Sequence, residues 1–161
     1  MILNHHEILH KIRRMAYQIY EANVDESEIV IAGIADNGYH LAELLKTELE
    51  RIAPFNVQLC RVQMNKKNPI DQVVCDCPLE RVKDQSIVLV DDVLHSGTAL
   101  IYGVAHFLQV PLKQFKTAVL VDRNHKKYPV KADFKGISLS TSMNENVVVD
   151  FTPGAYSARL A

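Results

Sequence analysis

The sequence predicts an α/β fold, in which a doubly wound parallel sheet carries an additional helix at its N-terminal end. A continuous apolar run of strand length at residues 29–35 is expected for a strand buried on both faces, four apolar residues stand at 87–90, and a further strand is expected at 115–121. Segments with apolar residues at helical spacing alternate with these runs, which is the pattern of parallel strands joined by helices. The 161 residues, 48% of them hydrophobic, suffice for one domain with a substantial core and are too few for two.

The N-terminal helix is predicted to begin after Asn4, because Asn4 and Glu7 have the spacing of a capping box. Apolar residues then recur at helical spacing, and we expect the helix to end near Asn23. His6 and His10 lie one helical turn apart, but no third ligand stands in a fixed relation to them. We therefore expect them on a solvated helix face rather than in a metal site.

The first apolar run, residues 29–35, leads through the turn Asp36-Asn37-Gly38 into a helix that Pro54 ends. A second strand is expected from Asn56 to Val62. The polar interval from Gln63 to Gln85 is too long for an ordinary connection. It is either a functional lid or carries a hairpin of its own.

The central motif is VLVDDVLHSGTAL, at residues 88–100. Asp91 and Asp92 follow the strand at 87–90, and in an open α/β sheet ligands lie beyond the carboxyl ends of the strands. The Ser-Gly-Thr turn at residues 96–98 offers hydroxyls, backbone N–H groups and the positive end of a helix dipole, which suit a phosphate. The acids suit sugar hydroxyls, a divalent cation or positive charge developing on a sugar ring. A ribose phosphate satisfies both halves of the motif.

The remainder of the chain departs from the alternating pattern. After the strand at residues 115–121, residues 122–146 are predicted to be rich in loops, with short apolar fragments at Phe134 and at 137–139. A last strand is expected from Val147 to Asp150.

The charge balance and the cysteines restrict the class of protein. A formal net charge of −1 gives no global basic field, which argues against a protein that mainly coats nucleic acid. The three cysteines lack the paired spacing of a structural zinc site, and no signal-peptide pattern is seen, so we expect a reduced chain in the cytoplasm. No apolar run approaches the roughly 20 residues that cross a bilayer. The cysteines are Cys60, Cys75 and Cys77.

A local basic cluster leaves two interpretations open. Its lysines form either a solvated surface, which we favour, or a patch that faces RNA. They are Lys126, Lys127, Lys131 and Lys135.

The motif at residues 88–100 resembles the phosphoribosyl pyrophosphate signature of the type I phosphoribosyltransferases, in which four apolar residues precede two acids and a Thr/Ser-Gly loop. The stretch AVLVDRNHKKYPVKADFKGISLSTS, residues 118–142, resembles one subfamily more closely: the bifunctional pyrimidine operon attenuators and uracil phosphoribosyltransferases, or PyrR. The N-terminal helix and the turn after Gly33 also align with this family. The resemblance covers nearly the whole chain apart from the polar interval.

The resemblance implies a single phosphoribosyltransferase-like domain over residues 1–161, with a small hood mainly from residues 122–146 and a flexible lid within residues 63–85. It implies that phosphoribosyl pyrophosphate donates ribose 5-phosphate to a uracil-like pyrimidine, with Mg²⁺ as cofactor and pyrophosphate as leaving group. UMP is the matching nucleotide, and a homodimer or a higher even oligomer is expected. No membrane partner is expected.

The resemblance also assigns roles to individual residues. Asp91 and Asp92 would contact the ribose hydroxyls directly or through magnesium, with Arg61 as a third catalytic residue. The 5-phosphate would bind to the loop formed by His95, Ser96, Gly97, Thr98 and Ala99. The pyrophosphate loop corresponds to Ala35, Asp36, Asn37 and Gly38. The base would lie near Asp122, Arg123, Phe134 and Lys135.

Departures from the family pattern concern the pyrophosphate half of the site. PyrR has Lys-Thr-Arg-Gly where this chain has residues 35–38, so two positive charges are missing and one negative charge is added. Charge-assisted hydrogen bonds to phosphate contribute about 1.5–3 kcal/mol each, so pyrophosphate binding weakens unless magnesium or the lid compensates. Arg61 is kept, but Val62 and Gln63 replace the two acids that follow it in PyrR, and Ala99 replaces the last Thr of the phosphate loop.

These departures leave three hypotheses open. The first is a uracil-type phosphoribosyltransferase. The second is a nucleotide-sensing regulator of pyrimidine genes that catalyses poorly or not at all and that in one form binds RNA. The third is a transferase for another base.

Overall fold

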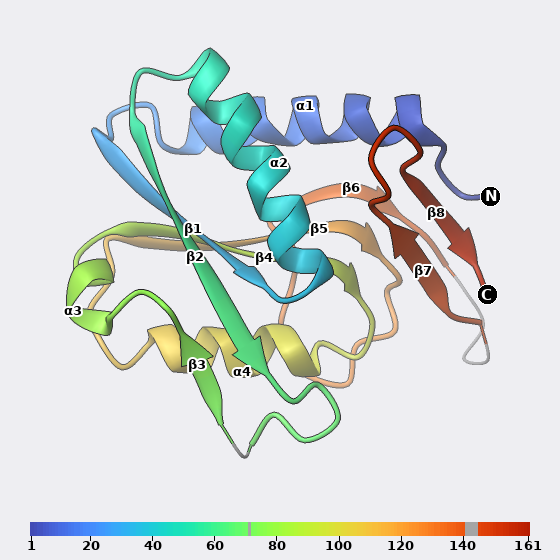
Figure 1. The fold of residues 1–161 in the computed structure, drawn as a ribbon. Helices are drawn as coiled ribbons and strands as arrows, with labels where there is room; N and C mark the ends of the chain where they lie inside the picture. Colours follow the sequence, from blue (N-terminus) through green and yellow to red (C-terminus); the bar gives the residue numbers. More distant parts are fainter. Residues whose placement is uncertain (71, 141–144) are drawn as a thin grey trace.

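The computed structural model describes residues 1–70, 72–140 and 145–161 (Figure 1). Its strands are β1 (Glu28–Ile34), β2 (Asn56–Met64), β3 (Val73–Cys75), β4 (Ser86–Leu94), β5 (Gln114–Asp122), β6 (Phe134–Ser138), β7 (Val147–Asp150) and β8 (Ser157–Leu160). Its helices are α1 (His5–Ala22), α2 (Asn37–Ile52), α3 (Leu79–Val82) and α4 (Thr98–Phe107).

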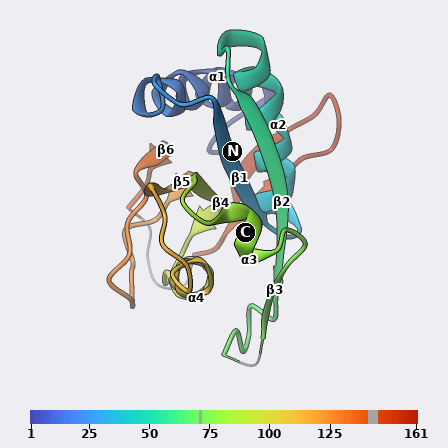
Figure 2. The same cartoon turned by 90° about the vertical axis from the view of Figure 1, so that its left-hand side faces the viewer.

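The described residues form one main sheet in the order β3-β2-β1-β4-β5-β6. All neighbouring strands in it are parallel except β3, which runs antiparallel to β2. Helices α1 and α2 cover one face and α4 covers the other, as Figures 1 and 2 show. The prediction of a doubly wound α/β fold with an added N-terminal helix is confirmed.

Two hydrophobic cores lie on the two faces of this sheet. Ile29 and Ile31 of β1 pack in the core beneath α1 and α2, whereas Val30 and Ala32 pack in the core beneath α4. Side chains alternate between the faces of a strand, so a central strand covered on both sides is apolar at every position. This accounts for the continuous apolar run in β1.

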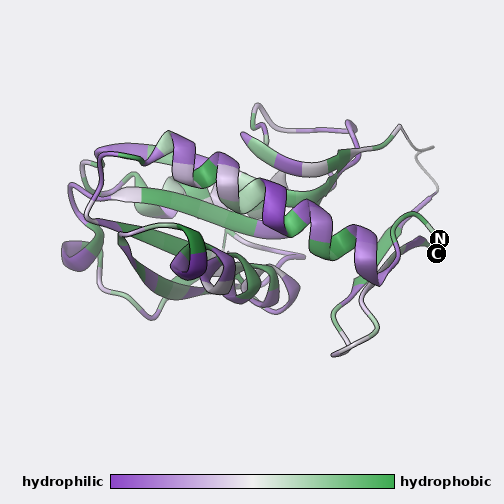
Figure 3. Cartoon of the chain, turned by 90° about the horizontal axis from the view of Figure 1, so that it is seen from above, coloured by the Kyte–Doolittle hydropathy of each residue, from purple (hydrophilic) through white to green (hydrophobic). Residues whose placement is uncertain are grey.

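The capping box of α1 is formed as predicted. The Asn4 side chain accepts a hydrogen bond from the Glu7 N–H at 2.9 Å, and the Glu7 carboxylate accepts one from the Asn4 N–H at 3.0 Å. Hydropathy alternates along the helix, with polar residues on its outer face (Figure 3). His6 and His10 are exposed, as expected for a solvated face.

The polar interval, residues 63–85, was predicted to be either a lid or a hairpin, and the structure shows a hairpin there. Strand β3 pairs with the end of β2, with Val62 opposite Cys75 and Met64 opposite Val73. Strand β2 therefore extends to Met64, beyond the predicted end at Val62. The proposed lid includes residue 71, which lies outside the described residues.

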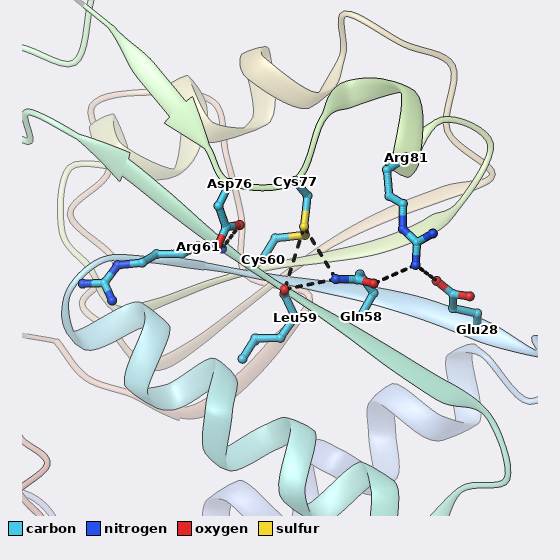
Figure 4. The surroundings of a disulfide bond; sticks show 8 residues. All are labelled: Glu28, Gln58, Leu59, Cys60, Arg61, Asp76, Cys77 and Arg81. Atoms are coloured by element: carbon cyan, nitrogen blue, oxygen red, sulfur yellow. Dashed lines mark hydrogen bonds and ion pairs between the residues drawn. A yellow bond between two sulfur atoms is a disulfide. The ribbon is translucent and has the colours of Figure 1, made fainter.

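Cys60 of β2 and Cys77 are joined by a disulfide bond across a sequence separation of 17, with their Cα atoms 5.7 Å apart (Figure 4). The expectation of a reduced chain is therefore wrong for this pair. Cys60 lies in β2 and Cys77 follows β3, so the pairing of these two strands brings them together, which spacing along the sequence could not reveal. Next to the bond, the Asp76 carboxylate accepts a hydrogen bond from the Arg61 N–H at 2.8 Å. These contacts anchor the base of the hairpin.

The C-terminal region differs from the prediction in two respects. Residues 134–138 form β6 and join the main sheet beside β5, so the expectation of loop is wrong for this segment. Strand β7 occupies the predicted residues but is not the last strand, because β8 follows and pairs with it. Residues 141–144 of the predicted hood lie outside the described residues.

Strands β7 and β8 form a separate small sheet, to which Leu3 adds an antiparallel bridge with Ala158. The two chain ends consequently lie side by side (Figures 1 and 3). Among the described residues, no helix combines the length and apolar character needed to cross a membrane.

Candidate functional site

A cavity of about 350 Å³ lies at the carboxyl end of β4 and the start of α4. The structure brings the predicted acids and the whole predicted phosphate loop to this one cavity. It is lined by Lys66, Asp91, Asp92, Val93, Leu94, His95, Ser96, Gly97, Thr98, Ala99 and Leu100.

The phosphate loop turns sharply at Gly97, which has φ of 90°. A Cβ atom there would lie 2.6 Å from a Val130 methyl carbon, so both the backbone conformation and the available space require glycine. The Ser96 and Thr98 hydroxyls lie 2.7 Å apart, and the Ser96 hydroxyl accepts a hydrogen bond from the Thr98 N–H, at the start of α4, at 3.3 Å. The loop therefore presents hydroxyls and a helix N-terminus, the combination that binds phosphate.

Strand β4 continues past the acids to Leu94, whereas the sequence predicted its end at Val90. Asp91 and Asp92 thus lie within the paired part of β4, where Asp91 is opposite Val119 of β5. Asp91 is only 3% exposed, and Asp92 is partly buried. The acid pair is held by the sheet rather than by a loop.

Each acid has defined partners. An Asp91 carboxylate oxygen accepts hydrogen bonds from Lys66 Nζ at 3.1 Å and from the Asp92 N–H at 2.9 Å. Asp92 accepts from the Val93 N–H at 2.9 Å and from Asn37 Nδ2 at 3.2 Å. Burial and, next, the neighbouring charge of Asp92 raise the pKa of Asp91 to about 7, although Lys66 acts in the opposite direction.

The acid pair fits a magnesium ion by its chemistry. Asp91 and Asp92 supply carboxylate oxygens, the ligands that Mg²⁺ prefers. Their mutual repulsion contributes to the raised pKa of Asp91, and a shared divalent cation would relieve it. Elsewhere in the described residues, potential ligand atoms of Cys60, Asp76 and Cys77 lie within 4.8 Å of one another. The two cysteine sulfurs are bonded to each other in the disulfide.

The predicted pyrophosphate loop adjoins the acids. Asn37 Nδ2, besides contacting Asp92, donates to the Val149 carbonyl at 2.8 Å. A Cβ atom on Gly38 would lie 2.7 Å from the Val90 carbonyl oxygen and 2.9 Å from Asp91 Cα, so glycine lets α2 begin directly against β4. The peptide bond between Ala35 and the following residue is cis.

Arg61 lies beside this loop. Its guanidinium contacts the Asp36 carboxylate at 3.2 Å and lies 5.0 Å from the centre of the Tyr39 ring. The Asp36 side chain is 83% exposed, so the ion pair is accessible to solvent. Asp36, which the resemblance predicts to be an added negative charge in this loop, thus forms a solvent-exposed ion pair with Arg61.

The predicted base-binding residues occupy two environments. Arg123 contacts His95 Nδ1 through its guanidinium at 2.7 Å, and Lys135 Nζ lies 3.7 Å from the buried Asp122 carboxylate. Phe134 is 7% exposed and belongs to the hydrophobic core, so little of its ring faces solvent.

His95, in the predicted phosphate loop, contacts Arg123, one of the predicted base-binding residues. Its burial and, next, the Arg123 charge lower its pKa, which favours the neutral ring. Because Nδ1 faces the guanidinium donor, the ring proton is assigned to Nε2. A neutral His95 can therefore still donate a hydrogen bond.

A family model described as phosphoribosyl transferase domain matches residues 1–153. The chain belongs to the phosphoribosyltransferase family. The Bifunctional protein PyrR of Bacillus subtilis strain 168 is 31% identical to this phosphoribosyltransferase over 160 residues, with 92% of this chain and 88% of the relative covered. PyrR of Streptococcus pneumoniae strain CGSP14 is 33% identical over 151 residues, with 88% and 83% covered. The resemblance to type I phosphoribosyltransferases and to PyrR is confirmed.

Solved structures show the same fold. The hypoxanthine phosphoribosyltransferase of Trypanosoma cruzi superposes with a TM-score of 0.79 at 15% identity, covering 92% of this chain and 84% of that one. A hypoxanthine-guanine phosphoribosyltransferase of Bacillus anthracis gives a TM-score of 0.70 at 20% identity, with 85% and 80% covered. At these identities the similarity concerns the fold and not the base.

Lys66 lines this cavity, although the sequence did not mark it as a candidate site residue. It lies in the polar interval, 25 residues before Asp91, and had been assigned only to the lid. One signal was present, because Lys66 follows a strand that ends at the same sheet edge as the acids. The strand order must be known before this position indicates a contact between Lys66 and the acids.

Proposed function

We propose that this phosphoribosyltransferase transfers ribose 5-phosphate from phosphoribosyl pyrophosphate to a uracil-like pyrimidine and releases pyrophosphate, with Mg²⁺ as cofactor. The observation that carries the proposal is the single cavity that joins Asp91 and Asp92 to the N-terminus of α4. The N-terminus of α4 supplies N–H groups that can bind a phosphate dianion, and the two carboxylates supply acceptors for the hydroxyls of a ribose ring.

In the proposed mechanism, the residue 95–99 loop binds the 5-phosphate and positions the sugar. Asp91 and Asp92 accept hydrogen bonds from the ribose hydroxyls and stabilise positive charge that develops as the bond from the anomeric carbon to pyrophosphate breaks. A uracil nitrogen then forms the new bond to that carbon and loses its N–H proton to solvent, so no covalent enzyme intermediate is required. Mg²⁺, when bound by the two acids, supplies positive charge that offsets the charge of the pyrophosphate.

The choice of base rests on the resemblance over residues 118–142 and on the PyrR relatives. In the proposal, Phe134 and the backbone near Lys135 face the base, and Asp122 and Arg123 lie close to its polar edge. A transferase for another base is the alternative at this step.

The test is turnover of purified protein with phosphoribosyl pyrophosphate and Mg²⁺, supplied in parallel with uracil, with hypoxanthine or without a base. We expect UMP and pyrophosphate with uracil only, measured by chromatography. Formation of a purine nucleotide instead would overturn the choice of base, and no reaction with any base would overturn the enzyme assignment.

Replacement of Asp92 tests the position of the site. We expect Asp92→Asn to lower kcat by about 10²–10³-fold, the usual effect of removing one group that stabilises transition-state charge. The melting temperature should change little, because Asp92 is only partly buried. Asp25→Asn, at an exposed position, is the matched control. Unchanged turnover in Asp92→Asn would show that the reaction takes place elsewhere.

A second candidate function, a nucleotide-sensing regulator, is favoured by the Arg61–Asp36 ion pair. Arg61 is the cation that the structure shows in contact with the predicted pyrophosphate loop, and it is already paired with Asp36. This candidate predicts UMP binding without measurable pyrophosphate release. Calorimetric titration with UMP, beside the turnover assay, distinguishes the two functions.

RNA binding belongs to the second candidate. The four lysines of the basic cluster are exposed, but Lys131 and Lys135 form ion pairs with Asp133 and Asp122. If the cluster binds the leader RNA of a pyrimidine operon, affinity must fall steeply with salt, because phosphate contacts release counterions. A flat salt response would exclude this role.

The resemblance also carries two broader parts of the proposal, a cytoplasmic location and a homodimer or higher even oligomer. Sedimentation of the purified protein should then give an even multiple of the 18.2 kDa chain mass. A monomer would contradict the proposed assembly.

A further inference from the structure

Lys66 lies two residues beyond the last residue of β2 and reaches the acid pair from the hairpin. Its Nζ atom is 3.1 Å from an Asp91 carboxylate oxygen, and its side chain remains 41% exposed while that of Asp91 is 4% exposed. The ammonium therefore contacts a buried carboxylate at the mouth of the cavity, with solvent on its other side.

The position of Lys66 is determined by the sheet. The last pair of the β2–β3 ladder joins Met64 to Val73, and the disulfide between Cys60 and Cys77 ties the same two segments together. Strand β1 separates β2 from β4, and all three are parallel, so the ends of β2 and β4 lie at one sheet edge. Lys66 is thus directed to Asp91 by strand order and register.

The charges around the cavity make this contact significant. Among the described residues that line it, Lys66 is the sole lysine or arginine. The adjoining loop at residues 35–38 has no basic residue, and the nearby Arg61 is paired with Asp36. Lys66 is therefore the one lysine or arginine of the described cavity lining that could contact a pyrophosphate group bound beside the acid pair.

We propose that Lys66 exchanges partners during binding: it neutralises Asp91 until Mg²⁺ and a pyrophosphate group enter, and then contacts the pyrophosphate while the metal takes its place at Asp91. This inference rests on the proposed function. A lysine suits the exchange, because its flexible four-carbon chain and compact charge can follow either partner. Lys66 and Mg²⁺ compete for one carboxylate, whereas Lys66 and pyrophosphate attract each other.

The proposal predicts effects of opposite sign in one variant. In Lys66→Ala, Mg²⁺ alone should bind about threefold more tightly or better, since its competitor at Asp91 is gone. Magnesium pyrophosphate should bind about 10- to 100-fold more weakly, since one charge-assisted contact is lost. Isothermal titration calorimetry with each ligand measures both changes. A residue that only supported the fold would weaken both.

Two further variants control the experiment. Lys67→Ala removes the adjacent, exposed lysine, which does not line the cavity, and should leave both affinities unchanged. Lys66→Arg keeps the charge and should restore pyrophosphate binding. Equal affinities in wild type and Lys66→Ala, or weakening of both ligands, would overturn the exchange. If the wild-type protein binds neither pyrophosphate nor phosphoribosyl pyrophosphate, the proposed function itself is overturned.

Discussion

Asp91 lies in surroundings that oppose its negative charge. Its carboxylate is almost fully buried and adjoins Asp92, and these two causes raise its pKa to about 7. The contact with Lys66 offsets part of this effect. A cation or sugar hydroxyls bound to Asp91 would stabilise its negative charge. Without them, the buried charge lowers the stability of the folded chain.

Asp91→Asn is predicted to stabilise the fold above neutral pH. Because the folded pKa exceeds the ordinary pKa of an aspartate side chain, 3.8, Asp91 contributes stability that is fully present below about pH 4 and is lost as pH rises through about 7. The amide does not ionise, so the variant should gain roughly 1–4 kcal/mol over wild type at about pH 8.

Thermal unfolding of both proteins at a series of pH values, with chelator present, measures this difference. It should shrink toward zero near pH 4. A variant that is less stable than wild type at about pH 8 would show that the contact with Lys66 outweighs burial.

At the scale of the element, the β2–β3 hairpin combines a short ladder with a covalent link. The ladder joins only Val62–Met64 to Val73–Cys75, so it is weak without additional support. The disulfide between Cys60 and Cys77 closes this segment at its base. It holds the hairpin, and with it Lys66, against the sheet.

Loss of the disulfide is predicted to lower stability. The chain-entropy argument gives about 3 kcal/mol for a loop of this length. The double variant Cys60→Ala/Cys77→Ala and wild-type protein treated with dithiothreitol should show a similar decrease in melting temperature. Cys75→Ser is the matched control, since Cys75 is not in the disulfide. A melting temperature that dithiothreitol leaves unchanged would exclude the bond as a source of stability.

At the scale of the whole molecule, one sheet separates two cores that share its strands. Strands β1 and β4 contribute alternate residues to both cores, as with Val88 on one face and Leu89 on the other. Neither core can be lost without disrupting strands that the other needs. The small β7–β8 sheet is connected to the main sheet through Leu3, which bridges to Ala158 of β8 and packs in the core beneath α1 and α2.

We therefore predict that the chain unfolds as a single cooperative domain. Differential scanning calorimetry should give one transition, with equal calorimetric and van't Hoff enthalpies. Two resolved transitions would contradict the prediction of one domain over residues 1–161.

Most elements were predictable because their signals are local. The capping box of α1, the apolar run of β1 and the acids followed by the Ser-Gly-Thr turn are each contiguous in the chain. Strand β8 and the extension of β4 were missed, because their pairing partners, β7 and β5, stabilise them more than any pattern of their own.

The sequence by itself determined the α/β class and the juxtaposition of the acid pair with the Ser-Gly-Thr turn, because hydrophobic periodicity and a contiguous motif specify them. Only the tertiary structure decided that Lys66 meets Asp91, that Arg61 meets Asp36 and that Cys60 bonds to Cys77. These pairs are 25, 25 and 17 residues apart in the chain. They come together only through the order β3-β2-β1-β4, which depends on how the strands pack into one sheet and is not encoded in any local stretch.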